Sequence, residues 1–202
     1  MSKFFKALEQ AEQERALRHE ARGPALVAGG GALQTEIVEQ HGAQPPREVS
    51  PEAPDRVEEH LVSLLAPASR EAEQYRALRH LVEQLHRSAD LSVVAVTSPG
   101  GDDGKTTTAI NLAGALAQAP EGRVLLVDID LRGSSLPTKL GLDGQADRGL
   151  VEAILDPGLP LEAVVQHCPP FNLFVLPAGH LPAAPYEVLK SPRVGELLQE
   201  AR

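Results

Sequence analysis

The chain has 202 residues, of which 42% are apolar and 23% are charged, and these proportions argue against wholesale disorder. A net charge of −9 excludes the broad basic surface that nucleic-acid backbones bind, so no nucleic-acid partner is expected. The single cysteine, Cys168, allows no intrachain disulfide, and no apolar run is long enough for a membrane span or a signal peptide. We therefore expect a cytoplasmic protein.

The first 69 residues divide into two segments by composition. Residues 1–22 space apolar side chains among many charged ones, which predicts an amphipathic helix. This helix is either a docking element for a partner or a membrane surface, or a solvated tail. Residues 23–69 are rich in Pro and Gly without periodicity, and we interpret them as a linker. Within it, the apolar run at 61–65 forms either a turn of helix or a strap across the next domain.

Residues 70–202 alternate helical and strand patterns, as expected of one α/β domain. Apolar residues three and four apart predict a helix that begins at Glu71. Short β-branched and apolar runs predict buried parallel strands at 91–96, 124–127 and 173–176. Further helices are predicted at 106–119, at 150–155 and after Ser191-Pro192. Together they predict a three-layer sandwich with a mostly parallel sheet.

A glycine-rich loop, Ser98 to Thr107, joins the first predicted strand to the next helix. A strand, a glycine loop and a helix in this order let backbone N–H groups and the helix dipole converge on phosphate oxygens. Lys105 would reach the β and γ phosphates, and the Thr106 hydroxyl would bind Mg²⁺. The loop therefore predicts a P-loop site for ATP and Mg²⁺ that consists of Gly100, Gly101, Asp103, Gly104, Lys105, Thr106 and Thr107.

Two features of this loop depart from the usual phosphate-binding sequence. Pro99 stands where the pattern has its first glycine. Asp102 and Asp103 bring negative charge close to the expected phosphates, so we expect both to point outward or to act only through a cation, with weakened nucleotide affinity. The alternative, an ordinary glycine turn with an exposed lysine, is disfavoured by the flanking strand and helix.

Two carboxylates follow the predicted strand at 124–127, namely Asp128 and Asp130. The carboxyl ends of parallel strands form the edge where α/β sheets bind ligands. Asp128 would hold Mg²⁺ together with Thr106, and both carboxylates would orient a hydroxyl nucleophile for in-line attack. A strand-capping aspartate with a solvated neighbour is the alternative.

These motifs together resemble the bacterial tyrosine kinases that regulate capsule and exopolysaccharide export. Residues 99–107 are similar to that family's Walker A motif, and residues 128–132 to its Walker A′ motif. The family's E-x-x-R-x-x-R motif is matched by Glu73, Arg76 and Arg79. Looser similarities are found at Asp147-Arg148-Gly149-Leu150, at residues 175–179 and at Ser191-Pro192-Arg193.

The resemblance implies an ATP- and Mg²⁺-dependent protein-tyrosine autokinase with a P-loop NTPase-like fold. Its catalytic residues would be Lys105, Asp128 and Asp130. Homo-oligomers are implied as well, because in the family the motif matched by Glu73, Arg76 and Arg79 joins subunits into a ring. A membrane-embedded activator of the polysaccharide co-polymerase type would bring the protein to the inner face of the membrane.

The chain also departs from this family. Members continue with an apolar strand ending in Asp, the Walker B motif, and usually with a tyrosine-rich tail. Here the only apolar run that ends in Asp is the one that ends at Asp128 itself. The only tyrosines are Tyr75 and Tyr186. We therefore expect a sheet that is incomplete at the C-terminus. We favour a fragment of a longer kinase over a short form that binds nucleotide poorly and acts in assembly.

A partitioning-type ATPase switch of the same superfamily is a further alternative. Those ATPases carry a second lysine near the start of the loop, five residues before the position of Lys105. Gly100 stands there in this chain. This difference favours the kinase.

Overall fold

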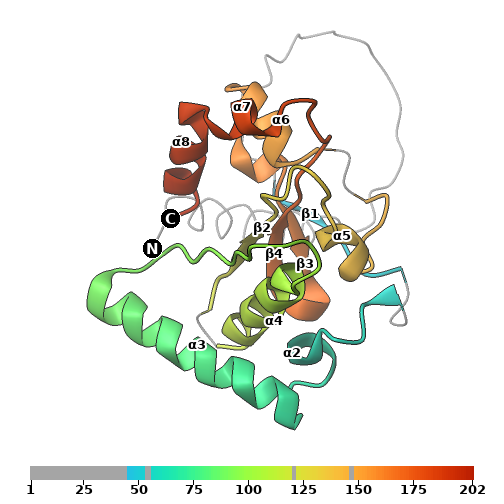
Figure 1. The fold of residues 1–202 in the computed structure, drawn as a ribbon, viewed down its shortest axis with the longest axis vertical. Helices are drawn as coiled ribbons and strands as arrows, with labels where there is room; N and C mark the ends of the chain where they lie inside the picture. The colour runs from blue at the N-terminus through green and yellow to red at the C-terminus, as the bar shows by residue number, and fades with distance from the viewer. Residues whose placement is uncertain (1–44, 53–55, 120–121, 146–147) are drawn as a thin grey trace, which may run out of the picture.

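The computed structural model describes residues 45–52, 56–119, 122–145 and 148–202 (Figure 1). The predicted N-terminal helix and the first part of the predicted linker lie outside these residues. None of the described helices is long and apolar enough to cross a bilayer.

A four-stranded sheet forms the middle layer, with the strand order β1-β3-β4-β2. Its strands are β1 (Arg47–Glu48), β2 (Leu125–Val127), β3 (Gln166–Cys168) and β4 (Leu173–Leu176). β2 is parallel to β4, with Leu126 opposite Val175, and β1 is parallel to β3. β3 and β4 run antiparallel. The sheet is therefore mixed, and β2 is its last described strand.

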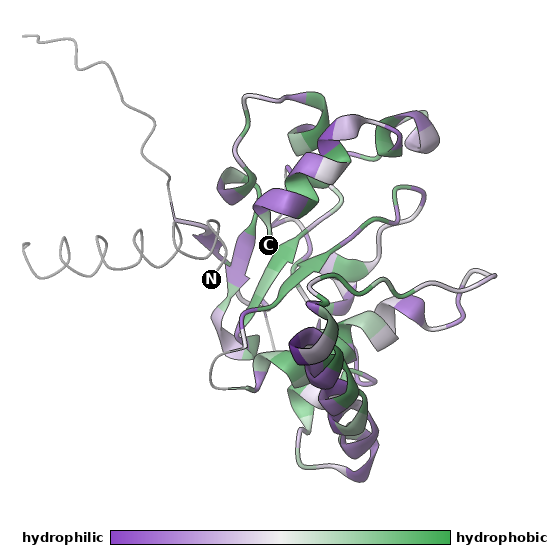
Figure 2. Cartoon of the chain, turned by 90° about the vertical axis from the view of Figure 1, so that its left-hand side faces the viewer, coloured by the Kyte–Doolittle hydropathy of each residue, from purple (hydrophilic) through white to green (hydrophobic). Residues whose placement is uncertain are grey.

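Helices cover both faces of this sheet, as the three-layer prediction requires. Side chains alternate between the two faces along a strand. Leu173 and Val175 of β4 pack in one core with α4 (Lys105–Ala117), whereas Phe174 and Leu176 pack in a second core with α6 (Leu150–Leu155). Figure 2 shows the central strands as predominantly hydrophobic. These two cores confirm the α/β fold.

The predicted helices are present with small shifts at their ends. The helix predicted from Glu71 is α3 (Arg70–Ala89), capped by Ser69, whose side chain accepts from the Ala72 N–H at 3.1 Å. Pro192 opens α8 (Pro192–Glu200), as its position predicts. Shorter helices are α2 (Val62–Leu65), α5 (Leu136–Lys139) and α7 (Pro185–Leu189), with 3₁₀ turns η2 (Leu161–Ala163) and η3 (Pro169–Phe171).

The described part of the predicted linker packs into the domain. β1 joins the sheet, and Leu61 is fully buried in the core beneath α4. The buried Asn111 side chain of α4 accepts from the Ser63 N–H at 2.8 Å and donates to the carbonyls of His60 and Thr107 at 2.9 and 3.0 Å. The apolar run at 61–65 is thus both a turn of helix and a strap across α4.

The loosely similar stretches near residues 149 and 177 meet at the start of α6. A Cβ atom at Gly149 would overlap the Pro177 carbonyl oxygen, while the Leu150 N–H donates to that oxygen at 2.8 Å. Glu152 accepts from the N–H groups of Gly149 and His180. Burial raises the pKa of Glu152, but these hydrogen bonds outweigh it and leave the pKa below the usual 4.5. These contacts therefore hold the two stretches against each other at the start of α6.

One strand prediction is wrong in this structure. Residues 91–96 form no strand, and Val93 and Val94 are 44% and 46% exposed. In Figure 1 this segment runs from α3 to α4 without an arrow. A strand needs a neighbour about 4.8 Å away, and an open cleft separates this segment from β2. The composition suits a buried strand, but no described strand lies beside it.

Candidate functional site

The glycine loop leads directly into α4, so that Lys105 is the first residue of the helix. Gly104 caps the helix with φ of +81°, a left-handed conformation that favours glycine, and Asp102 also has a positive φ, +54°. The N–H groups of the first helical turn have no partner within the helix and are available to an anion. The local backbone therefore has the form that a phosphate-binding loop needs.

Asp103 turns back into the loop, and the expectation that its side chain points outward is wrong. Its carboxylate accepts from the Gly100 N–H at 2.9 Å, while the Ser98 hydroxyl donates to the Gly100 carbonyl at 2.9 Å. A carboxylate oxygen accepts the hydrogen bond of a loop N–H with a negatively charged atom, as a phosphate oxygen would. Asp103 therefore competes with phosphate for this amide.

Asp128 organises the turn that follows β2. Its N–H donates to the Leu176 carbonyl at 2.9 Å, which extends the pairing with β4 by one residue. Its buried carboxylate accepts from the Asp130 N–H at 3.0 Å and from the Ser134 hydroxyl at 2.6 Å. The carboxylate is thereby held at the carboxyl end of the strand, where the sequence predicted it.

Lys105 and Asp130 face each other across the site. The Lys105 Nζ lies 3.6 Å from the Asp130 Oδ2, and both side chains are about one-third exposed. Partial exposure leaves the lysine able to exchange this carboxylate for a phosphate. Of the three predicted catalytic residues, the structure thus brings these two into contact.

Oxygen donors suitable for Mg²⁺ gather beside this pair. The Thr106 hydroxyl accepts from the Ser135 hydroxyl at 3.5 Å, and the Asp128 carboxylate lines the same cleft. Hydroxyl and carboxylate oxygens are ligands that Mg²⁺ prefers, with phosphate and water completing the shell. No group of three or more His, Cys, Asp or Glu suited to a metal occurs among the described residues. The donor set therefore fits a magnesium ion that is bound together with nucleotide.

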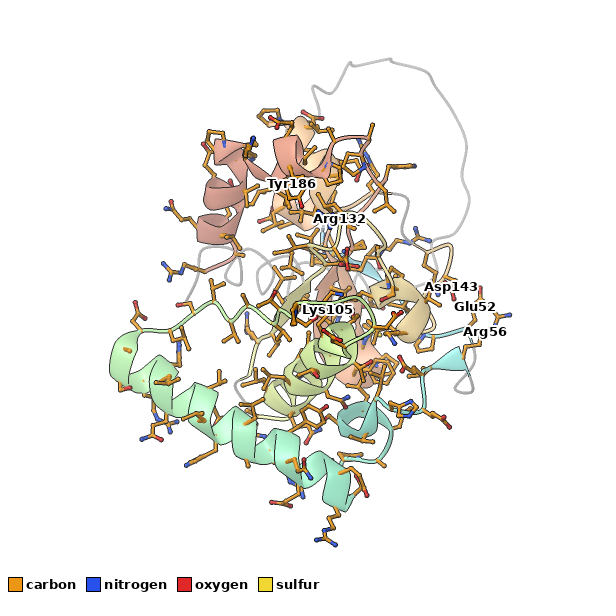
Figure 3. All side chains as sticks on the ribbon, in the orientation of Figure 1. Glu52, Arg56, Lys105, Arg132, Asp143 and Tyr186 are labelled. Carbon is orange, nitrogen blue, oxygen red and sulfur yellow. The ribbon has the colours of Figure 1, made fainter. Side chains whose placement is uncertain are left out.

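The sequence analysis missed a contact between Arg132 and Tyr186. The guanidinium donates to the Tyr186 hydroxyl and lies 4.9 Å from the ring centroid. Figure 3 shows Arg132 between Lys105 and Tyr186 in this view. Both residues line the same cleft as Lys105 and Asp130, which has a volume of about 2880 Å³. The position of Arg132, two residues after Asp130, was the one sequence signal for this contact.

Comparisons with known proteins show what the chain is similar to. Residues 94–180 match the family described as the CobQ/CobB/MinD/ParA nucleotide binding domain. The tyrosine-protein kinase YwqD of Bacillus subtilis is 34% identical over 146 residues, which cover 72% of this chain and 60% of YwqD. The BceF tyrosine kinase domain superposes with a TM-score of 0.61 at 30% identity, over 70% of this chain and 55% of that domain.

The chain is similar to the bacterial tyrosine kinases, and its nucleotide-binding region is similar to the CobQ/MinD/ParA superfamily. A third relative, the succinoglycan biosynthesis transport protein ExoP of Rhizobium meliloti, is 31% identical over 143 residues, or 68% of this chain and 17% of ExoP. The chain thus spans less than two thirds of the length of each of these relatives.

The residues of the E-x-x-R-x-x-R motif make contacts within the chain. Arg76 pairs with Glu73 and donates to the Pro67 carbonyl. Arg79 donates to Glu83 at 2.6 Å and to the Ala115 carbonyl of α4 at 3.2 Å. Arg79 therefore helps to hold α3 against α4, and the motif lies on α3, away from the phosphate loop.

Replacing Lys105 with Ala should weaken Mg·ATP binding about 10- to 100-fold, because a hydrogen bond to a charged group contributes about 1.5–3 kcal/mol. Isothermal titration calorimetry on the full chain measures this. Lys190→Ala, which changes an exposed lysine at the C-terminal end of α7, is the matched control and should bind as the unaltered chain does. Equal affinity of the Lys105→Ala and Lys190→Ala chains would remove Lys105 from the site.

Replacing Asp103 with Asn should tighten Mg·ATP binding roughly fivefold. The amide can still accept from the Gly100 N–H, but one negative charge near the phosphates is lost, a difference of about 1 kcal/mol at a few ångströms in water. The same calorimetry measures it, with Asp143→Asn, an exposed residue outside the loop, as the control. Weaker binding by the Asp103→Asn chain would mean that the carboxylate supports the nucleotide.

Proposed function

We propose that this chain binds ATP and Mg²⁺ and carries the phosphate-binding part of a protein-tyrosine kinase. The contact between Lys105 and Asp130 supports this most directly, because it joins the phosphate loop to the acidic strand end across 3.6 Å. Two separate motifs thereby form one site with a cation for phosphate and a carboxylate for a hydroxyl group. The similarity to YwqD and to the BceF kinase domain supports the same activity.

In this proposal each residue has a distinct part in phosphoryl transfer. The loop N–H groups and Lys105 stabilise the charge that develops on the transferred phosphoryl group. Thr106 and Asp128 would hold Mg²⁺, which would supply positive charge to neutralise the phosphates. Asp130 accepts the proton of a tyrosine hydroxyl as its oxygen bonds to the γ phosphorus, while the bond to the β-phosphate oxygen breaks and ADP leaves.

We further propose that the kinase serves exopolysaccharide synthesis or export. The name of the similar protein ExoP refers to succinoglycan biosynthesis and transport, which supports this setting. The chain would be cytoplasmic and act at the inner face of the membrane through a membrane-embedded activator. A pull-down of the tagged chain from membranes, with Lys105→Ala as the control, would identify that activator.

Incubation of the full chain with Mg·ATP should produce phosphotyrosine, which mass spectrometry detects. We expect it at Tyr186, because this side chain is 64% exposed and contacts Arg132, which follows Asp130 at the same strand end. Tyr186→Phe should abolish the signal and Tyr75→Phe should leave it unchanged, while Lys105→Met abolishes it by removing the phosphate ligand. Release of inorganic phosphate without phosphotyrosine would favour a partitioning-type ATPase switch, to which the matched nucleotide-binding family also extends.

A second candidate function is that of an assembly element which forms homo-oligomers through the face of Glu73, Arg76 and Arg79. The exposed ion pair between Arg76 and Glu73 favours it, because these side chains can exchange partners at little cost. This function requires neither phosphoryl transfer nor bound nucleotide.

Charge reversal at Arg76 separates this candidate from the kinase. Arg76→Glu should convert nucleotide-free oligomers into monomers, because it places two like charges on the interacting face. Arg87→Glu, at the far end of the same helix, is the control and should leave the oligomers intact. Sedimentation velocity measures both, and a monomeric unaltered chain at every concentration would contradict the assembly function. Arg79 is less suitable for this test because it also contacts α4.

A further inference from the structure

Arg132 holds the phenol of Tyr186 by two contacts at once (Figure 3). Its guanidinium donates to the Tyr186 hydroxyl, and the guanidinium carbon lies 4.9 Å from the ring centroid. Tyr186 lies in the first turn of α7, whereas Arg132 lies in the turn that follows β2. A single side chain thus binds both the polar and the aromatic part of a tyrosine that comes from a distant segment.

The backbone of Arg132 is joined to the proposed base. The Arg132 N–H donates to the Asp130 Oδ1 at 3.4 Å, while the other carboxylate oxygen, Oδ2, lies 3.6 Å from the Lys105 Nζ. Asp130 therefore lies between the cation expected to bind phosphate and the cation that holds a phenol. Transfer of a phosphoryl group to a tyrosine requires the phosphate ligand, the base and the acceptor in this order.

The phenol site on Arg132 is open to a side chain from another polypeptide. Arg132 is exposed, and Tyr186 is 64% exposed. Among the residues that the structure describes, no carboxylate forms an ion pair with the Arg132 guanidinium. Exposed contacts between a cation and a ring are weak, so Tyr186 can leave at little cost and another tyrosine can take its place.

The two contacts together suit tyrosine and no other hydroxyl amino acid. Serine and threonine have a hydroxyl that could accept the hydrogen bond, but they have no ring. Arginine is well matched to a phenol because its planar guanidinium donates hydrogen bonds and also stacks on aromatic faces. A site that donates to a substrate hydroxyl also rejects analogues without that hydroxyl, such as phenylalanine.

We propose that Arg132 is the tyrosine-binding residue of this site, and that it selects tyrosine over serine and threonine as the acceptor. It binds the phenol of Tyr186 in the chain alone and the phenol of a tyrosine in another polypeptide when Tyr186 moves away. Arg132 positions the hydroxyl beside Asp130 and takes no proton itself. The role in acceptor selection rests on the proposed kinase function, whereas binding of the phenol requires no nucleotide.

A fluorinated phenol tests the binding in the absence of nucleotide. Tyr186→Ala removes the phenol that the chain itself supplies, and para-fluorophenol is then the probe, observed by fluorine NMR. We expect its line to broaden with the Tyr186→Ala chain. Adding Arg132→Met should keep the line narrow, because methionine has no hydrogen-bond donor. Fluorobenzene, which has the ring without the hydroxyl, should stay narrow with both chains.

Arg87→Met in the Tyr186→Ala chain is the matched control. Arg87 is an exposed arginine in the last turn of α3, so this chain should broaden the probe as Tyr186→Ala alone does. Broadening that persists after Arg132→Met would overturn the proposal, because the phenol would then bind elsewhere. A narrow line with the Tyr186→Ala chain would overturn it as well.

Transfer to a peptide with one tyrosine separates acceptor binding from a merely structural role. In the Tyr186→Ala chain with Mg·ATP, Arg132→Met should raise KM for this peptide about tenfold and leave kcat unchanged, because the hydrogen bond and the ring contact hold the acceptor before and during transfer. Arg132→Lys should recover part of the loss, since an ammonium group also donates to a hydroxyl. The affinity for Mg·ATP should be the same in all these chains.

The same peptide with serine in place of tyrosine should be a poor substrate of the chain that keeps Arg132. An unchanged KM for the tyrosine peptide after Arg132→Met, or an equal loss of Mg·ATP affinity, would overturn the selection of tyrosine by Arg132. If no chain transfers phosphate while para-fluorophenol still binds through Arg132, the proposed kinase function fails and the phenol site stands.

Discussion

The hydrogen bond from the Asp128 N–H to the Leu176 carbonyl, at 2.9 Å, fixes the acidic strand end to the most buried strand of the sheet. The Asp128 carboxylate is held by this pairing and by Ser134, and it in turn accepts from the Asp130 N–H. Asp130 reaches Lys105, which α4 presents at its first turn. The position of every candidate catalytic group thus depends on how β2 and α4 pack against each other.

The strand that should precede the loop is the weak point of this arrangement. α4 holds the loop at Lys105, but residues 91–97 lack a partner strand among the described residues. Backbone that is unpaired and exposed opens at low free energy, so the loop is anchored at one end only.

Charge around the loop sets a second limit on nucleotide affinity. Asp103 binds the Gly100 N–H, and Asp130 pairs with Lys105, so carboxylates already contact two groups that phosphates would use. Mg²⁺ reduces this conflict because it shares its charge between the carboxylates and the phosphates. The groups that would bind phosphate are therefore already paired with carboxylates of the same chain.

Sequence patterns predicted the elements whose signals are local. Apolar runs gave β2 and β4 because alternate side chains of these strands enter the two cores. β1 and β3 lacked such a signal: Arg47 and Glu48 are exposed, and β3 reads Gln-His-Cys. The composition of residues 91–96 strongly predicted a buried strand. Composition shows only that a segment prefers burial, and it does not show whether a neighbouring strand is there to pair with it. Nor could local patterns give the contact between Arg132 and Tyr186, which are 54 residues apart.

The turn of Asp103 into the loop also escaped the sequence analysis. Like-charge repulsion from a nucleotide predicts an outward side chain, but the chain alone has an unpaired amide at Gly100 that a carboxylate can satisfy. A hydrogen bond three residues away therefore decides the conformation before any ligand binds. Sequence reasoning identified the groups of the site more readily than their partners in the free chain.

Amide hydrogen exchange on the free 202-residue chain tests the central claim most directly, namely that residues 91–97 are not paired in the sheet. We expect fast exchange at Val93 to Val96 and slow exchange at Leu126 and Val175, whose strands pair with each other. Exchange at Val93 to Val96 as slow as that at Leu126 would show that this segment is a strand of the sheet, and would contradict the account.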